Sequence, residues 1–293
     1  MSPRFAPETW TAWVQAPNLP ALDPAAAEER TICEVFREYL QGFLTTMPPA
    51  PLQREALEGF FQDLKVYNEA ILTFNAHTNL TRLTSPVDMG LKNFLDAILL
   101  WPALATALEK KSQVPMPGAH SPSLADLGSG AGIPGLVLGL LSKYLLPTQP
   151  TLVLIESQKK RCNFLTETAG QLGLGSSQVL WARSEDLGQD PKWRESFAVV
   201  TARAVAPLEQ LLEYASGLVA VGGTFLAMKG AEGAKEWEKA KKAAATCSFS
   251  LAALWEYQLP VLGDERTLLL FEKKAPLSPR YPRPTAQIKK RPL

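Results

Sequence analysis

The chain has 293 residues, of which 46% are hydrophobic and 20% charged, and its formal net charge at pH 7 is +1. These values are typical of a globular protein with one large domain and a smaller one, and they argue against a disordered chain or a protein held on nucleic acid by net charge alone. The first residues lack the apolar core of a signal peptide, and apolar stretches such as Gly135 to Leu141 are too short to span a bilayer. We therefore expect a cytoplasmic protein without a membrane segment. The cysteines Cys33, Cys162 and Cys247 are too far apart for a zinc site or a disulfide framework, so we expect no metal.

The first third of the chain is predicted to be mainly helical. Residues 1–51 form an extension with three basic and six acidic residues, which we expect to be loosely attached. Residues 52–108 form a helical N-terminal part, in which apolar residues follow helical spacing from Leu52 to Phe74. Ser85-Pro86 supplies a cap and a first-turn proline for a second helix. The polar segment from Glu109 to Ser123 is predicted to be a loop.

The stretch from Ser123 to Gly135 is the one around which the rest of the sequence is organised. It reads S-L-A-D-L-G-S-G-A-G-I-P-G, a short apolar run followed by four closely spaced glycines, and a leucine-rich helical pattern follows from Leu136 to Leu146. Glycine lets backbone N–H groups approach a ligand, and the N-terminus of a helix offers unsatisfied donors. A strand, a glycine turn and a helix in this order therefore indicate a nucleotide-type site.

Predicted strands and helices alternate after this stretch. The expected strands are Leu152–Ile155 ending in Glu156, Gln178–Trp181, Phe197–Thr201, and Thr224–Met228 after a Gly222-Gly223 turn; the expected helices are Lys159–Leu172, Pro207–Val219 and Glu232–Thr246. A closing hairpin is predicted from Leu251–Leu259 and Arg266–Glu272. The alternation predicts an α/β fold with a mostly parallel sheet over residues 120–274 and with ligands at the carboxyl ends of the strands.

The glycine pattern does not by itself identify the nucleotide. Gly130 to Gly135 also satisfies the G-x-G-x-x-G pattern of NAD-dependent dehydrogenases. Asp126 stands where a carboxylate can approach a positively charged methionyl ligand, although an acid there can also simply hold the loop. Glu156 can accept hydrogen bonds from the ribose of either cofactor. Ser184-Glu185 follows the third strand and Arg203 the fourth, at the mouth of the same expected cleft.

Motifs along the chain resemble one known family, the bacterial ribosomal RNA small subunit methyltransferases G, also called glucose-inhibited division protein B. The resemblance covers roughly Leu52 to Leu293. The matching residues are N-L-T at 79–81, K-x-F-L-D at 92–96, D-L-G-S-G-A-G-I-P-G at 126–135, E-S-Q-K-K-R at 156–161, A-R-S-E-D-L at 182–187, T-A-R-A-V-A at 201–206, M-K-G at 228–230, G-D-E-R at 263–266 and R-Y-P-R at 280–283. Two positions depart from the family pattern: Asn93 stands where relatives commonly have His, and the tail differs after Arg283.

The resemblance implies a class I methyltransferase with a Rossmann-like fold and S-adenosylmethionine as cofactor. It further implies that the enzyme methylates N7 of guanine 527 in the 16S rRNA of the small ribosomal subunit or its assembly intermediate. Guanine N7 carries a free lone pair, so positioning suffices and no dedicated catalytic base is expected. The residues expected at the cofactor are Asp126, Gly128, Gly130, Ile133, Glu156, Ser184, Glu185 and Arg203. Of these, the resemblance implies Gly128, Ile133, Ser184, Glu185 and Arg203, with Glu156 on the ribose.

Basic residues are the candidates for RNA contacts. They are Arg82, Lys92, Lys229, Arg280 and Arg283, with Arg266 and Lys289 to Arg291 as further members of the set. Residues 275–293 carry five basic residues and no acidic one, so we expect a basic tail that is either solvated or follows phosphates. Lys159 to Arg161 open a helix against its dipole, which is compatible with an RNA-facing role.

Two other functions remain open on the sequence alone. One is an NAD-dependent dehydrogenase, and the other is a nonenzymatic RNA-binding protein of ribosome assembly that keeps the fold. Cofactor binding and methyl transfer would distinguish them from a methyltransferase.

Overall fold

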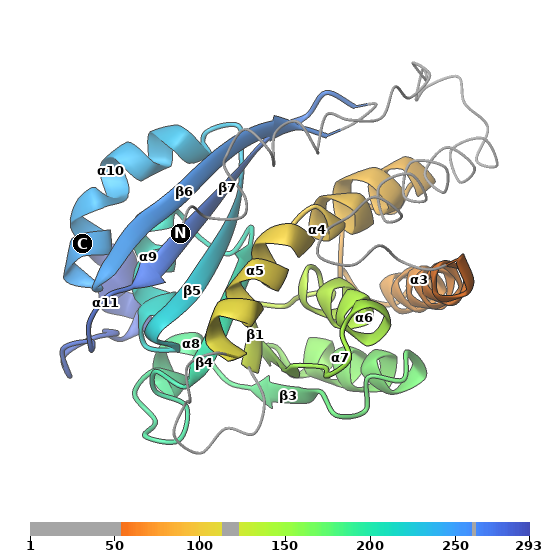
Figure 1. Ribbon diagram of the computed structural model, residues 1–293, viewed down its shortest axis with the longest axis horizontal. Helices are drawn as coiled ribbons and strands as arrows, with labels where there is room; N and C mark the ends of the chain where they lie inside the picture. The colour runs from red at the N-terminus through yellow and green to blue at the C-terminus, as the bar shows by residue number, and fades with distance from the viewer. Residues whose placement is uncertain (1–53, 113–122, 260–261) are drawn as a thin grey trace.

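The computed structural model describes residues 54–112, 123–259 and 262–293, so the predicted extension 1–51 lies outside the described residues. A seven-stranded sheet crosses the molecule with helices on both of its faces (Figure 1). The strand order is β3-β2-β1-β4-β5-β7-β6. Strand β7 is antiparallel to both of its neighbours, and the other neighbouring strands are parallel. The α/β fold with a mostly parallel sheet is confirmed, and so is the closing hairpin.

Buried apolar runs form the centre of the sheet. The strands are β1 Ser123–Leu127, β2 Thr151–Glu156, β3 Gln178–Trp181, β4 Phe197–Arg203, β5 Val219–Gly230, β6 Phe249–Gln258 and β7 Glu265–Lys273. Strands β1, β2 and β4 are buried along almost their whole length, because helices cover both faces of a parallel sheet. Because β1 to β4 are parallel, their carboxyl ends lie at the same end of the sheet. This brings together the last residues of the four strands, Leu127, Glu156, Trp181 and Arg203.

Two helical layers cover the sheet. One face carries α3 Arg54–Asn75, the π-helix η1 Asp88–Leu95, α4 Asp96–Ile98, α5 Trp101–Ser112, α6 Gly135–Leu145 and α7 Lys159–Gln171. The other face carries α8 Ser184–Leu187, α9 Leu208–Ser216, α10 Gly233–Thr246 and α11 Thr285–Lys290. Each layer buries its own apolar cluster against the sheet.

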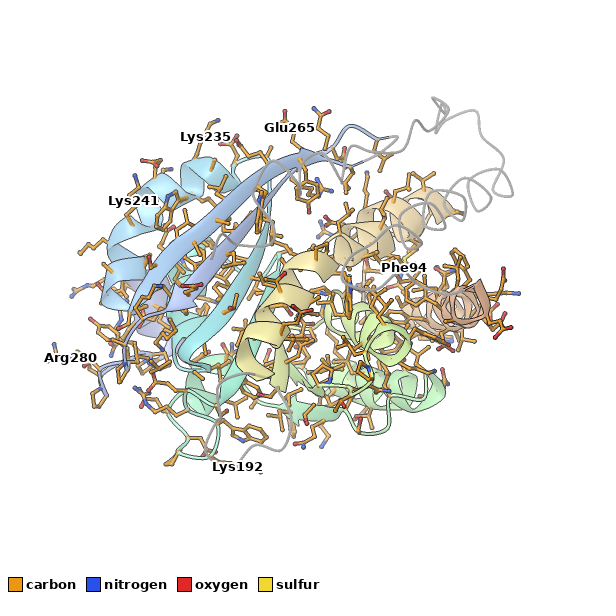
Figure 2. The ribbon with its side chains drawn as sticks, viewed as in Figure 1. Phe94, Lys192, Lys235, Lys241, Glu265 and Arg280 are labelled. Carbon is orange, nitrogen blue, oxygen red and sulfur yellow. The ribbon has the colours of Figure 1, made fainter. Side chains whose placement is uncertain are left out.

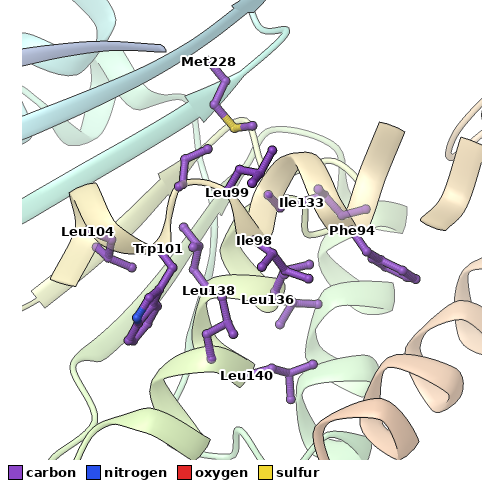
Figure 3. Close-up of a cluster of buried hydrophobic side chains, with 14 of the residues drawn as sticks. Phe94, Ile98, Leu99, Trp101, Leu104, Ile133, Leu136, Leu138, Leu140 and Met228 are labelled. Carbon is purple, nitrogen blue, oxygen red and sulfur yellow. The ribbon is translucent and has the colours of Figure 1, made fainter. Parts of the chain in front are cut away.

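The N-terminal helices share their core with the sheet. Figure 3 shows Phe94, Ile98 and Trp101 of this region beside Leu136 and Leu140 of α6, within one buried cluster. Helix α6 is buried from its first residue to Ser142, since it lies between the sheet and the N-terminal helices. The helices before the glycine stretch therefore help to hold the helix that follows it.

One apolar segment is longer than the sequence analysis expected. By length and composition, Asp88–Glu109 would suffice to cross a membrane, with a mean hydropathy of 1.3. In the structure 89% of the apolar 18-residue window within that stretch is buried inside the protein. Its hydrophobicity is accounted for by the core in Figure 3.

Some predicted boundaries are wrong. The loop predicted from Glu109 to Ser123 is too long at both ends. Helix α5 continues to Ser112, and β1 already begins at Ser123. The helix predicted to reach Val219 ends at Ser216, because Val219 already belongs to β5. Apolar residues near an element's end fit a helix or a strand equally well, so periodicity could not place these limits.

The predicted Gly222-Gly223 turn is an irregularity within β5 rather than a turn before it. The pairing with β4 passes from Val219 directly to Thr224, and Gly222 has φ +71°. A Cβ on Gly223 would lie 2.7 Å from the Ala220 carbonyl oxygen, which is too close for any other residue. The strand therefore bulges between Val219 and Thr224, and its pairing with β4 resumes at Thr224.

The basic tail is docked onto the protein. Ile288 of α11 is fully buried and Leu277 is 4% exposed. The Arg283 guanidinium donates to both carboxylate oxygens of the buried Glu213, from Nε at 2.8 Å and from Nη2 at 2.6 Å. The expectation of a solvated tail is wrong in this respect, because two apolar side chains and an ion pair hold residues 275–293 against α9.

Candidate active site

The glycine stretch forms a tight loop between β1 and α6. Gly128, Gly130 and Gly132 have φ values of +69°, +56° and +91°, a region in which side chains are strained. The N–H groups of Gly128 and Ser129 both donate to the Ile155 carbonyl oxygen, at 2.9 and 3.0 Å. The loop is thereby tied to the end of β2, as a site at the carboxyl ends of the strands requires.

Asp126 lies beneath this loop. It is 1% exposed; its Oδ2 accepts the Gly135 N–H at 3.2 Å and its Oδ1 accepts the Thr201 hydroxyl at 3.0 Å. These contacts join the first turn of α6 to β4. Of the two interpretations given to Asp126 from the sequence, the geometry favours the one in which it holds the loop.

The pH dependence of stability tests this position. Burial raises the pKa of Asp126 from 3.8 to about 6. A carboxyl with a raised pKa in the folded state contributes stability that is complete below its unfolded pKa and is lost as pH rises through the folded pKa. We expect the free energy of unfolding of the wild type, relative to Asp126→Asn, to fall by roughly 2–3 kcal/mol between pH 4 and pH 7. Urea unfolding of both proteins across that range measures the difference, and parallel curves would contradict the assignment.

Glu156 ends β2 beside the loop, as predicted. Its Oε2 accepts the Gly130 N–H at 3.0 Å and its Oε1 accepts the Gln158 N–H at 2.8 Å. The Arg161 guanidinium lies 3.9 Å away. The side chain is buried and fixed in orientation; Oε1 also accepts the Ser157 hydroxyl at 3.4 Å, while Oε2 has a further lone pair with which to accept a ligand hydroxyl.

A cavity of about 420 Å³ opens next to the loop. Gly128, Ser184 and Glu185 line it together with Ile155 and the segment Val205 to Pro207. Glu185 is 5% exposed, and its Oε1 has no hydrogen-bond partner among the described residues. A buried carboxylate oxygen without a partner is costly, so this atom fits a ligand that donates a hydrogen bond.

Arg203 is held by the N-terminal helices. Its Nη1 donates to the Lys92 carbonyl oxygen at 2.9 Å and its Nη2 donates to Asn93 Oδ1 at 2.7 Å. Both acceptors come from the π-helix η1, whose wider turn the sequence pattern did not predict. Asn93, the departure from the family pattern, is 2% exposed and positions the Arg203 guanidinium.

Asp96 links Arg203 to the closing hairpin. Its Oδ2 lies 3.7 Å from Arg203 and 3.7 Å from Arg266, and its Oδ1 accepts the Tyr257 hydroxyl at 2.8 Å. Burial raises the pKa of Asp96, and the two arginines and the tyrosine hydroxyl act in the opposite direction. The carboxylate thus joins three elements from distant parts of the chain.

A second cavity, of about 340 Å³, lies on the other side of the segment after β4. Its lining includes four cationic and two acidic residues: Lys92, Arg203, Lys229, Arg266, Asp96 and Glu236. Arg203 and Ala204 line this cavity, while the next residues, Val205 to Pro207, line the first. The two cavities therefore adjoin one another across a few residues.

The structure separates the predicted RNA residues into groups. Lys92, Lys229 and Arg266 meet in the second cavity, where Lys229 pairs with Glu236 at 2.7 Å. Arg82 is exposed beside that cavity's Leu83. Arg280 is exposed on the tail, where Figure 2 shows it at the edge of the molecule.

One residue that supports the site was missed by sequence reasoning. Tyr67 of α3, fully buried, donates its hydroxyl to the Ala131 carbonyl oxygen of the loop at 2.6 Å. The sequence marked it only as an apolar position on a helix. Lys289, by contrast, was predicted from the tail's charge to bind RNA, yet it lines the first cavity.

The chain is similar to known rRNA methyltransferases. A family model described as rRNA small subunit methyltransferase G matches residues 61–262. The methyltransferase of that name from Pelotomaculum thermopropionicum is 37% identical over 227 residues, which cover 78% of this chain and 88% of that protein. The one from Lactobacillus delbrueckii subsp. bulgaricus is 35% identical over 263 residues, covering 89% and 99%.

Among solved structures, the ribosomal protein L11 methylase from Lactobacillus delbrueckii subsp. bulgaricus aligns with a TM-score of 0.42 and 16% identity, over 63% of this chain and 79% of that one. The seven-stranded sheet with one antiparallel strand next to β5 is the class I methyltransferase fold that the sequence predicted. With the family match extending over most of the sheet, the chain belongs to the rRNA small subunit methyltransferase G family.

Proposed function

We propose that this protein uses S-adenosylmethionine to methylate N7 of guanine 527 in the 16S rRNA of the small ribosomal subunit, in the cytoplasm. The observation that carries the proposal is the pair of adjoining cavities on either side of the segment after β4. One is bordered by the glycine loop and suits a nucleoside cofactor. The other is lined by cationic side chains and suits part of an RNA.

The residues of the first cavity fit the cofactor. The positive φ of Gly128 and the absence of a Cβ leave the loop backbone open to a ligand. Glu156, next to this lining at the end of β2, offers its Oε2 as an acceptor for a ribose hydroxyl, and the unpartnered Oε1 of Glu185 offers one for a donor such as an amino group. When bound, the cofactor supplies a methyl group activated by its positively charged sulfonium. Ile133 and Gly130 belong to the same loop.

The second cavity suits a guanine nucleotide. The guanine O6 and N7 atoms are hydrogen-bond acceptors, and Lys and Arg side chains are their usual partners. Arg203, fixed by Asn93 and the Lys92 carbonyl oxygen, has a defined orientation at the boundary of the two cavities. The chain's contribution is then to hold the base and exclude other orientations, because the N7 lone pair needs no deprotonation.

The alternatives predict different behaviour. Membership of a methyltransferase family sets aside the NAD-dependent dehydrogenase. A nonenzymatic ribosome-assembly protein would bind RNA and transfer no methyl group, and this remains an outcome of the experiment below.

The experiment uses labelled S-adenosylmethionine with undermethylated small subunits and, in parallel, with naked 16S rRNA. Cleavage at 7-methylguanine maps the modified base. We expect one labelled guanine, and cofactor-dependent label at another atom or base would overturn the substrate assignment. Cofactor binding without transfer to either RNA would mean that the methyl acceptor is another molecule.

Tyr67→Phe tests how the N-terminal helices support the loop. The variant loses the hydrogen bond to Ala131 and retains the ring contact with Phe94, whose centroid lies 5.4 Å away. We expect the Kd for S-adenosylmethionine to rise about fivefold, which corresponds to roughly 1 kcal/mol for a neutral hydrogen bond. Isothermal titration calorimetry measures this change.

Tyr144→Phe is the matched control for that variant. The Tyr144 hydroxyl donates to Asp63 at 2.8 Å, which joins α6 to α3 at a point away from the loop. The Tyr144→Phe variant should lower the free energy of unfolding about as much as Tyr67→Phe does, and it should leave the affinity for S-adenosylmethionine unchanged. Equal cofactor affinities for both variants would contradict a specific role of Tyr67.

A further inference from the structure

One tryptophan lies unusually open to solvent at the edge of the sheet. Trp181 is 59% exposed, more than the other exposed large hydrophobic residues of the described chain, such as Val221 at 45%. It ends β3, which pairs with β2 on one side and is one of the two edge strands of the sheet. A single exposed apolar side chain is common on proteins, so exposure alone does not make a site.

The orientation of the Trp181 ring is fixed. Its indole N–H donates to the Ser157 carbonyl oxygen at 3.0 Å, and Lys159 Nζ lies 4.3 Å from the ring centroid. The side chain is thus held by the segment between β2 and α7 while most of its surface remains open. A rigid aromatic ring loses little conformational entropy when a flat ligand stacks on it.

Lys159 lies over this ring, and two more cationic residues are close to Lys159 or Trp181 in the sequence. Lys159, Lys160 and Arg183 are all exposed, and the first turn of α7 contains no acidic residue. Arg183 and Ser157 also line the first cavity. Trp181, at the end of the edge strand, is therefore two residues away in the sequence from a cationic residue of the cavity lining.

We infer that an unpaired base of the RNA substrate stacks on Trp181 while Lys159, Lys160 and Arg183 contact its flanking phosphates. Proteins bind single-stranded RNA by this combination of stacking and positive charge. The inference rests on the proposed function. The RNA is then held on both sides of the cofactor cavity: the methylated base in the second cavity and a neighbouring nucleotide on Trp181.

The test compares Trp181→Ala and Trp181→Phe with the wild type in steady-state methylation and in direct binding. Fluorescence anisotropy of a labelled, unmodified 16S rRNA transcript gives Kd without any need for turnover. We expect Trp181→Ala to raise the Kd and the KM for RNA about fivefold or more, with kcat and the KM for S-adenosylmethionine unchanged. Trp181→Phe should retain most of the affinity, and Lys160→Ala should reduce the salt dependence of binding.

Leu72→Ala, which truncates an exposed apolar residue on α3, is the control and should leave RNA binding unchanged. Unaltered RNA affinity in Trp181→Ala, or equal losses for the Ala and Phe variants, would overturn the stacking inference. Weaker binding to whole subunits with unchanged binding to the transcript would assign this surface to a ribosomal protein instead. If the wild type methylates no RNA, the proposed function is wrong. The anisotropy measurement does not depend on methylation, so it still decides whether Trp181 binds RNA.

Discussion

Gly128→Asp is expected to abolish measurable cofactor binding and to reduce methyl transfer about 100-fold or more. Gly128 has φ +69°, and a Cβ there would lie 2.8 Å from Val205 Cγ2, in the segment that separates the two cavities. A displacement of about 1 Å in a positioning element is sufficient for a rate loss of this size. The added side chain would also project from a residue that lines the first cavity, where it would occupy space that a ligand needs. Calorimetry and the labelled-methyl assay measure the two effects.

Gly170→Ala is the matched control for this substitution. Gly170 lies in α7, and no atom within 4 Å would meet its Cβ. Alanine in a helix is favoured over glycine by about 0.5–1 kcal/mol, so this variant should be as stable as the wild type or more so, with unchanged activity. Cofactor affinity within twofold of the wild type in Gly128→Asp would show that the glycine loop does not bind the cofactor.

The sheet and its order of elements could be predicted because their signals are local. Apolar runs such as Leu152 to Ile155, each followed by a turn and a helical pattern, gave the alternation that the structure confirms. The glycine stretch was recognisable for the same reason, since a turn with three positive φ values requires glycine at those positions.

The supports of the site could not be predicted in this way. Arg203 is oriented by Asn93, which is 110 residues away in the sequence, and Tyr257 reaches Asp96 across 161 residues. Such contacts depend on how the N-terminal helices pack on the sheet, and no periodic pattern records that packing. The π-helix that presents Asn93 differs from an α-helix by hydrogen-bond spacing, which composition does not reveal.

The tail shows how composition can mislead. Five basic residues and no acidic one suggested a segment exposed to solvent or RNA. The residues that decide the tail's position are the buried apolar Leu277 and Ile288, together with Glu213, which pairs with Arg283 from 70 residues earlier in the sequence. A charged side chain predicted to bind a phosphate can instead neutralise a buried carboxylate, and the sequence alone does not distinguish the two.

Arg283→Ala is expected to destabilise the protein by about 3 kcal/mol, because it leaves a buried charge without its partner. Glu213 is fully buried, and it accepts Arg283 Nη2 at 2.6 Å, Nε at 2.8 Å and the backbone N–H at 2.9 Å. This expected destabilisation is at the lower end of the range for broken buried ion pairs. The Arg283 side chain is 20% exposed, and the hydrogen bond from the backbone N–H of residue 283 to Glu213 remains in the variant. Urea unfolding at pH 7 measures the loss.

Two further variants separate an anchoring role from RNA binding. Adding Glu213→Gln to Arg283→Ala removes the unpaired charge and should recover part of the lost stability, which a simple loss of packing would not allow. Arg280→Ala, at an exposed position of the same tail, should change stability by less than about 0.5 kcal/mol. If Arg283→Ala leaves the free energy of unfolding unchanged and weakens binding to 16S rRNA more than Arg280→Ala does, Arg283 is an RNA contact. The opposite result assigns it to the tail's attachment, and through the tail to the position of Lys289 at the first cavity.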